Sequence, residues 1–173
     1  TAVSDNIFLV GHIDGISQFN LVSKKCNPLA YASSKIPKAK NVYRFVTTKA
    51  KGLVAVAENG LFVIDKNNIV VDYYGSLTNN TSHNLPITTI FDMYEDTKGI
   101  CWIATNGEGL FRWDWRHSES DKRISVKQFT LDQGLPSTIL YRIEEDMSAN
   151  LWIGTYNGLL RFNTLTYAPS VYT

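Results

Sequence analysis

The sequence has little of what most catalytic sites, metal sites and membrane anchors need. Its 173 residues include 2 cysteines and 3 histidines, and no apolar run approaches the roughly 20 residues that span a bilayer. A net charge of +1 without a basic cluster argues against a nucleic-acid partner. The histidines, His12, His83 and His117, lack the close spacing of metal ligands, so neither a metal nor another cofactor is expected.

The two cysteines are too few for a disulfide framework. Cys101 takes a repeat position that Phe8, Leu53 and Leu151 hold elsewhere, so we interpret it as a small buried apolar residue. Cys26 lies in a predicted loop, and a disulfide between it and Cys101 is not expected. No nucleophile motif such as G-x-S-x-G and no phosphate-binding glycine loop occurs.

What the sequence does have is a repeated hairpin. A short apolar run, a turn rich in Asn, Asp and Gly, and a second apolar run occur four times. The turns close on Gly15, Gly60, Gly109 and Gly158, so the repeat returns every 45 to 49 residues. Intervals of this length are typical of solenoids and propellers. Glycine suits such a turn because one of its residues needs a positive φ.

Further predicted strands flank these hairpins. Inner strands precede the last three hairpins at residues 42–46, 90–94 and 140–144, and outer strands follow two of them at residues 69–73 and 124–129. Four short strands rich in β-branched and aromatic residues, with no helical periodicity, predict a propeller blade.

The predicted fold is therefore all-β, a single β-propeller segment of about four blades, each with four antiparallel strands. The blades are expected at residues 1–35, 36–84, 85–134 and 135–173, with the first lacking its innermost strand. We expect an open arc that belongs to a larger multi-domain protein, and a closed four-bladed ring is the alternative. Exposed blade faces at both ends of an arc would favour self-association, for example as a dimer.

The conspicuous acids and tryptophans belong to the repeat. Asp96 and Asp146 stand six residues before Trp102 and Trp152, so we expect these carboxylates to cap a turn and both tryptophans to lie in the core. We find no unrepeated set of acids, histidines or arginines around the axis. A catalytic propeller, such as a lyase or glycosidase, is therefore the less favoured alternative.

Five residues outside this pattern are candidates for ligand contact. His12, Glu108 and Tyr156 lie in the variable hairpin turns, and His83 lies in a long polar connection at residues 79–83. These turns and connections share one rim, where polar groups around an aromatic ring would suit a sugar, although ordinary solvated turns are the alternative. Trp115 opens an irregular segment, residues 115–123, and either contacts a partner or covers the edge of its blade.

The best-defined repeats resemble the propeller repeat of two-component regulators. The similarity rests on W-I-G-T-Y-N-G-L-L-R-F-N at residues 152–163 and F-T-L-D-Q-G-L-P-S at residues 129–137. It extends to W-I-A-T at residues 102–105 and G-L-F-R-W-D at residues 109–114. The earlier blades depart from it, since Val54 replaces the tryptophan and Ala57 and His12 replace the threonine.

This resemblance implies the periplasmic sensor region of a hybrid histidine kinase of the kind found in Bacteroidetes. Such regions respond largely to oligosaccharides and are held at the inner membrane by other parts of the parent protein. The resemblance therefore implies a sensor segment that is not itself an enzyme. A passive protein-interaction scaffold is a further alternative. The repeat motif contains no ligand-binding residues, so none is transferred to this sequence.

Overall fold

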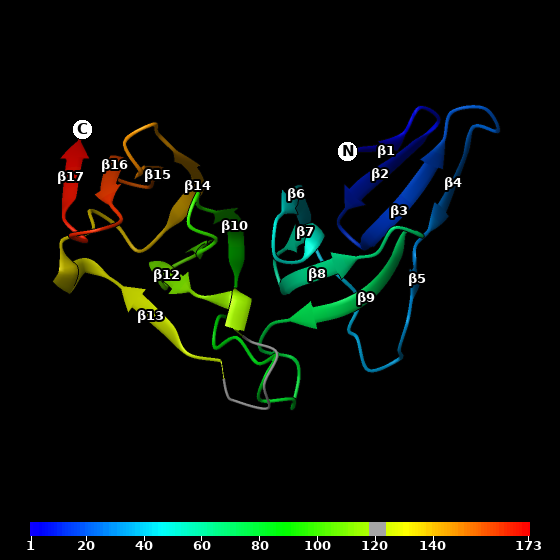
Figure 1. Cartoon of the computed structure of the whole chain (residues 1–173), viewed down its shortest axis with the longest axis horizontal. Helices are drawn as coiled ribbons and strands as arrows, with labels where there is room; N and C mark the ends of the chain where they lie inside the picture. Colours follow the sequence, from blue (N-terminus) through cyan, green and yellow to red (C-terminus); the bar gives the residue numbers. More distant parts are fainter. Residues whose placement is uncertain (118–123) are drawn as a thin grey trace.

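The computed structural model describes residues 1–117 and 124–173. Nearly all regular structure in these residues is β, in four sheets that follow one another along an open arc. The two chain termini lie at opposite ends of this arc (Figure 1). The predicted all-β propeller segment is confirmed, and residues 118–123 of the irregular segment lie outside the described residues.

Each sheet contains a four-stranded antiparallel unit in chain order. The first is β1 (Ala2–Ser4), β2 (Ile7–His12), β3 (Gly15–Asn20) and β4 (Lys25–Pro28). The second is β6 (Val42–Thr48), β7 (Gly52–Ala57), β8 (Gly60–Ile64) and β9 (Ile69–Tyr74). The third is β10 (Ile90–Glu95), β11 (Cys101–Thr105), β12 (Leu110–Trp113) and β13 (Val126–Phe129). The fourth is β14 (Leu140–Glu145), β15 (Asn150–Thr155), β16 (Gly158–Asn163) and β17 (Pro169–Tyr172).

Two features of the first two sheets differ from the prediction. The first blade does contain part of an innermost strand, because β1 pairs with β2 through Ala2 opposite Phe8 and Ser4 opposite Ile7. Three residues are too short to show a strand pattern in a sequence. In addition, β5 (Ala30–Tyr31) pairs in parallel with the outer edge of β9, where it covers an otherwise open strand.

Glycine is required where the hairpins meet the outer strands. Gly109 and Gly158 have φ values of 83° and 108°. A Cβ atom at either position would collide with the carbonyl oxygen of Phe129 or Tyr172 on the adjacent outer strand. The repeated glycine therefore serves both the turn and the close approach of the outer strand.

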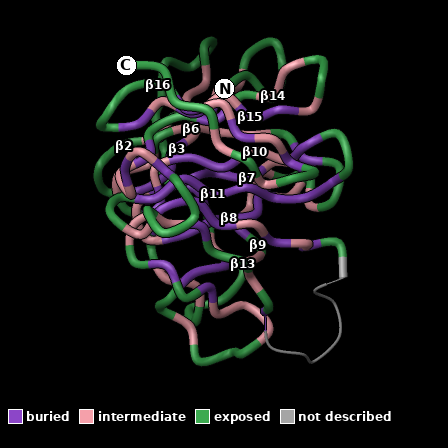
Figure 2. Tube along the Cα trace, turned by 90° about the vertical axis from the view of Figure 1, so that its left-hand side faces the viewer, coloured by how far each residue is buried: buried purple, intermediate pink, exposed green. Residues whose placement is uncertain are grey.

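The hydrophobic core lies between the blades. One cluster of buried side chains fills each of the three junctions between neighbouring sheets. Alternate residues of a strand face opposite neighbours, so Cys101 and Ile103 of β11 face the second blade while Trp102 faces the fourth. Figure 2 shows this buried interior along β7, β8 and β11. Among the described residues no cluster joins the first blade to the fourth, so the arc is open.

The expected aspartate caps are confirmed. Asp96 accepts the backbone N–H groups of Lys98 and Ile100, each at 2.9 Å, and the indole N–H of Trp102 at 2.8 Å. In the fourth blade, Asp146 accepts two backbone N–H groups of its turn and the indole N–H of Trp152 at 2.9 Å. The six-residue spacing thus fixes a repeated link between turn and strand.

The two tryptophans differ in their cover. Trp102 is fully buried, with its ring 5.7 Å from that of Phe162 in the next blade. Trp152 is half-buried and stacks on Tyr172 of its own sheet at 5.6 Å. The prediction that Trp152 lies in the core is therefore wrong, because in this arc no further blade covers that face.

Candidate functional site on the inner strands

The inner strands of the last three blades each carry a β-bulge at the same position. The strands β6, β10 and β14 lie next to one another on the concave side of the arc (Figure 1). The pairing register of each strand shifts around one aromatic residue, and these residues are Tyr43, Phe91 and Tyr141. A bulge leaves one residue without a partner in the ladder and redirects its side chain.

These three rings form a continuous row, which we call the aromatic ladder. The Tyr43 and Phe91 ring centroids lie 5.6 Å apart at an interplanar angle of 84°, and those of Phe91 and Tyr141 lie 5.8 Å apart at 17°. Tyr43 is 45% exposed and Tyr141 is 47% exposed. The ladder therefore crosses three blades and presents aromatic surface to solvent.

Charged residues follow the ladder residues in each inner strand. Asp92, with 1% of its side chain exposed, accepts hydrogen bonds from Arg44 Nη1 through both carboxylate oxygens at 3.0 Å. It also accepts the backbone N–H of Ile143 at 3.0 Å. Burial raises the pKa of Asp92, against the lowering effects of the Ile143 N–H and Arg44. Asp92 thus links the inner strands of three blades.

The charged pair at the end of this row is open to solvent. Arg142 Nε lies 3.5 Å from Glu144 Oε1 and 3.7 Å from Asp92 Oδ2. The side chains of Arg142 and Glu144 are 56% and 61% exposed. The inner strands therefore combine aromatic faces with accessible donors and acceptors.

This charged set was not predicted from the sequence, although the repeat contains its signature. When the inner strands are aligned, Tyr43-Arg44, Phe91-Asp92 and Tyr141-Arg142 fall at equivalent positions. An acid–base catalyst must reach its substrate, whereas Asp92 is buried and already bonded to Arg44. The arrangement therefore suits binding better than catalysis.

Two of the predicted contact residues, His12 and Glu108, are already bonded to other parts of the chain. His12 Nε2 lies 3.0 Å from Ser17 Oγ, and its Nδ1 accepts the Asp14 N–H at 3.3 Å. Glu108 Oε1 accepts the backbone N–H of Thr88 at 2.8 Å, which ties the hairpin turn to the connection before β10. These contacts give both residues a structural role at the rim.

His83 holds the long polar connection against the second sheet. Its Nε2 lies 3.0 Å from Asp72 Oδ1, and its Nδ1 lies 2.8 Å from Ser82 Oγ. The imidazole also stacks on Tyr74, with centroids 4.8 Å apart. Ser82 is the chain neighbour of His83, and its hydroxyl donates to Asn80 Oδ1 at 2.8 Å, so this cluster stabilises the loop.

Trp115 is buried, which contradicts its interpretation as a contact surface. Its side chain is 0% exposed in the short 3₁₀ helix η1 (Trp115–His117), and its indole N–H donates to Glu95 Oε1 at 3.0 Å. Its ring packs against Trp113 at 5.6 Å. Trp115 therefore covers the edge of its blade, the other interpretation that the sequence left open.

Tyr156 is hydrogen-bonded to the chain just before β14, the strand that carries the ladder residue Tyr141. It is 69% exposed, and its backbone N–H donates to the carbonyl of Ile139, two residues before Tyr141. At the other end of the ladder, partial burial and the charge of Glu58 raise the pKa of Tyr43. The hairpin turns at Glu58 and Tyr156 thus lie near the starts of the inner strands β6 and β14.

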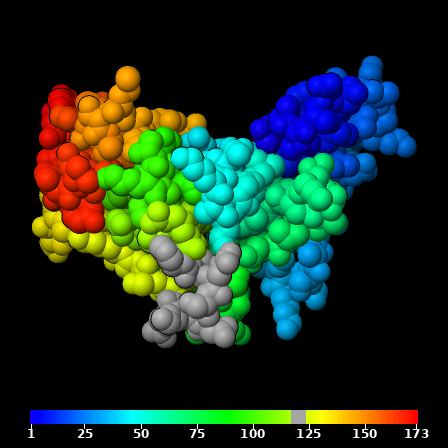
Figure 3. All heavy atoms as spheres, viewed as in Figure 1, coloured from blue at the N-terminus to red at the C-terminus, as the bar shows by residue number. Residues whose placement is uncertain are grey.

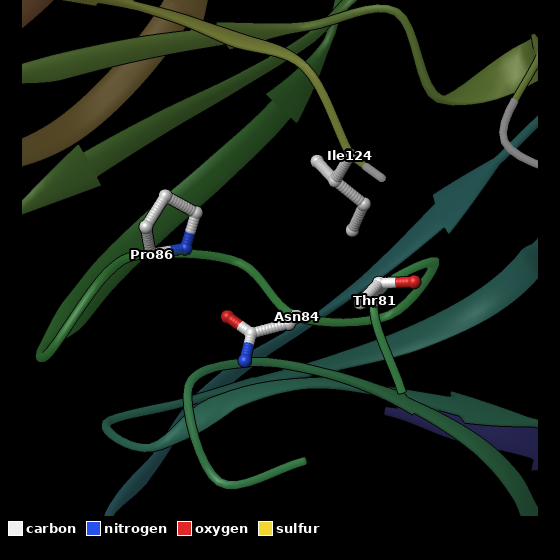
Figure 4. Close-up of a pocket in the computed structure, with 4 residues that line it drawn as sticks. All are labelled: Thr81, Asn84, Pro86 and Ile124. Atoms are coloured by element: carbon white, nitrogen blue, oxygen red, sulfur yellow. The ribbon is translucent and has the colours of Figure 1, made fainter. Parts of the chain in front are cut away.

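Other features of the described residues offer less. No group of three or more His, Cys, Asp or Glu side chains there could hold a metal ion, and no helix there is long and apolar enough to cross a membrane. A hollow of about 250 Å³ is lined by Thr81, Asn84, Pro86 and Ile124, whose side chains are drawn in Figure 4. None of its described lining residues is charged, and the Asn84 amide already donates to the Thr78 carbonyl at 2.8 Å.

The repeat itself has a known family. Residues 84–107, which include β10 and β11, match the repeat described as two-component regulator propeller. No curated protein matches the chain significantly.

Solved structures show the same propeller fold. An extracellular domain described as that of the hybrid two-component system BT3049 from B. thetaiotaomicron has a TM-score of 0.74 and 20% identity, over 95% of this chain and 22% of its own. The corresponding domain of BT4673 from the same organism gives 0.73 and 19%, over 97% of this chain and 24% of its own. PorZ of Porphyromonas gingivalis, a surface component of the type-IX secretion system, has a TM-score of 0.60 and 16% identity. The match covers 93% of this chain and 24% of PorZ. The chain thus spans about a quarter of the length of each of these relatives.

Proposed function

We propose that this chain is a ligand-sensing propeller segment from the extracytoplasmic region of a two-component signalling protein, and that its ligand is an oligosaccharide. The observation that carries the proposal is the regulator propeller repeat at residues 84–107. The likeness to extracellular domains of hybrid two-component systems over nearly the whole chain supports it. In this proposal the segment is periplasmic and does no chemistry, and a histidine kinase anchored in the inner membrane belongs to the rest of the parent protein.

The inner surface has the chemistry that a sugar requires. A sugar offers C–H groups on its ring faces and hydroxyls at its edge, and the ladder with its neighbouring Arg142 and Glu144 offers aromatic faces with donors and acceptors. The packed junctions between blades make the arc a stiff unit. Ligand binding would then bias the parent protein between two dimer arrangements.

A titration of this chain against soluble oligosaccharides tests the proposal. The panel contains defined fragments of plant and host glycans, and binding is followed by calorimetry and by saturation-transfer NMR. We expect at least one oligosaccharide to bind and to be recovered with unchanged mass. Cleavage of the bound sugar would favour the catalytic alternative. Failure of the whole panel to bind would favour the passive scaffold and contradict a sensing role for this segment.

A further inference from the structure

We propose that the aromatic ladder is the platform on which the sugar stacks, and that the ligand is an extended chain of two or more sugar rings. This inference rests on the proposed function, and it assigns that function to Tyr43, Phe91 and Tyr141. Large aromatic side chains normally stabilise a fold by being buried. The two terminal tyrosines of the ladder are nearly half exposed, so part of this stabilisation is lost.

The bulges are an independent observation in favour of a site. In β6, β10 and β14 the pairing with the next strand shifts register at one residue. That residue is aromatic in each strand. Bulges are enriched beside functional sites, where they redirect a side chain. The same bulge in three successive blades thus brings three aromatic side chains into one row.

The length of the ladder indicates the size of the ligand. Consecutive ring centroids lie 5.6 and 5.8 Å apart, so the row extends across three blades. A single sugar ring is similar in size to one aromatic ring and would leave most of the row uncovered. A chain of sugar rings can instead contact Tyr43 and Tyr141 together.

The polar groups around the ladder fit the same ligand. Tyr43 and Tyr141 place phenolic hydroxyls at the two ends, while Phe91 in the middle carries none. The exposed Arg142 and Glu144 lie 3.5 Å apart and can share hydroxyl groups of a bound sugar. The Arg44–Asp92 pair is by contrast largely buried, so it supports the platform without contacting the ligand.

The test compares Tyr43→Ala and Tyr141→Ala with Tyr172→Ala in the whole 173-residue chain. Tyr172 is a matched control because it is 48% exposed and lies on β17, away from the inner strands. Each variant is titrated by calorimetry with the oligosaccharide that binds most tightly, with its disaccharide and with its monosaccharide. Thermal melts verify that the variants fold, and Tyr141→Phe retains the ring without the hydroxyl.

We expect the two ladder variants to bind the oligosaccharide roughly tenfold more weakly, with Tyr172→Ala within about twofold of the unaltered chain. Tyr141→Phe should retain most of the affinity, and the monosaccharide should bind far more weakly than the oligosaccharide. An oligosaccharide that binds all variants equally would overturn the ladder as the site and leave the sensing function intact. Equal affinity for monosaccharide and oligosaccharide would overturn the extended ligand. Absence of binding to any glycan would instead contradict the proposed function itself.

Discussion

Two faces of the arc contain the same motif and differ in what lies against them. On the third blade, Asp96 holds Trp102 beneath the fourth blade, and the tryptophan is fully buried. On the fourth blade, Asp146 holds Trp152 by the same hydrogen bond, yet the face formed by Trp152, Leu159 and Tyr172 is partly open. Figure 3 shows this blade at one end of the molecule, opposite the N-terminal blade. The motif therefore fixes local geometry, while burial depends on the neighbouring blade.

The largest expected effect is a difference between the two tryptophans. Trp102→Ala should lower the free energy of unfolding by roughly 3–5 kcal/mol, because it empties a fully buried site. Trp152→Ala should cost less than half as much, since its ring is already partly hydrated. Urea melts of both variants measure the two losses in the free energy of unfolding. Equal losses would show that the open face is covered in solution.

Trp115 extends the comparison to a tryptophan outside the repeat. It is as buried as Trp102 and donates to Glu95, so Trp115→Ala should destabilise by roughly 3 kcal/mol. The same urea melts provide the measurement, with Leu131→Ala as a control because Leu131 is 58% exposed. If Trp115→Ala lost no more stability than Leu131→Ala, Trp115 would lie at the surface and not in the core.

The Asp146 cap should make part of the stability of the open blade depend on pH. Hydrogen bonds from the Asn150 backbone and the Trp152 indole lower the pKa of Asp146. The carboxylate thus contributes stability that is present above the unfolded pKa of about 3.9 and is lost as the pH falls toward the folded pKa. The difference in urea midpoint between the unaltered chain and Asp146→Asn should therefore shrink as the pH falls from 5 to 2.

An exposed acid supplies the control for this titration. Asp132→Asn in the short helix η2 (Leu131–Gln133) should change the midpoint little at any pH, because Asp132 is exposed. A midpoint difference for Asp146→Asn that stays constant between pH 5 and pH 2 would contradict the role of the ionised cap.

The smallest expected effect concerns association through the open face. Apolar side chains of Trp152, Leu159 and Tyr172 should promote weak self-association that grows with concentration. Light scattering after size exclusion would detect it, and Leu159→Lys should reduce it by placing a charge in the face. A monomer at high concentration for the unaltered chain would remove this face as a contact surface.

The sequence predicts what is local to one repeat. Spacing alone identifies the hairpins, and the six-residue interval between Asp146 and Trp152 identifies the cap. Burial of Trp152 could not be predicted in this way, because it depends on a neighbouring sheet rather than on the strand. The same holds for Trp115, which lies in a segment without a period.

The ladder escaped prediction for a different physical reason. In a regular strand, adjacent residues such as Tyr43 and Arg44 point to opposite faces. A bulge changes that alternation, and its position is visible in the strand pairing rather than in the residue pattern. The rim was predicted correctly as the place where hairpin turns gather, and its residue Tyr156 adjoins β14 through Ile139. Whether Tyr156 contacts ligand stays a prediction.

Calorimetric titration of the double variant Tyr43→Ala/Tyr141→Ala with the tightest-binding oligosaccharide decides whether the aromatic ladder binds the sugar. The control variant Tyr172→Ala carries an equivalent truncation at a tyrosine of similar exposure outside the ladder. Binding should be lost in the double variant and retained in Tyr172→Ala. Unchanged affinity in the Tyr43→Ala/Tyr141→Ala variant, with its fold intact, would show that the ladder is not the sugar site.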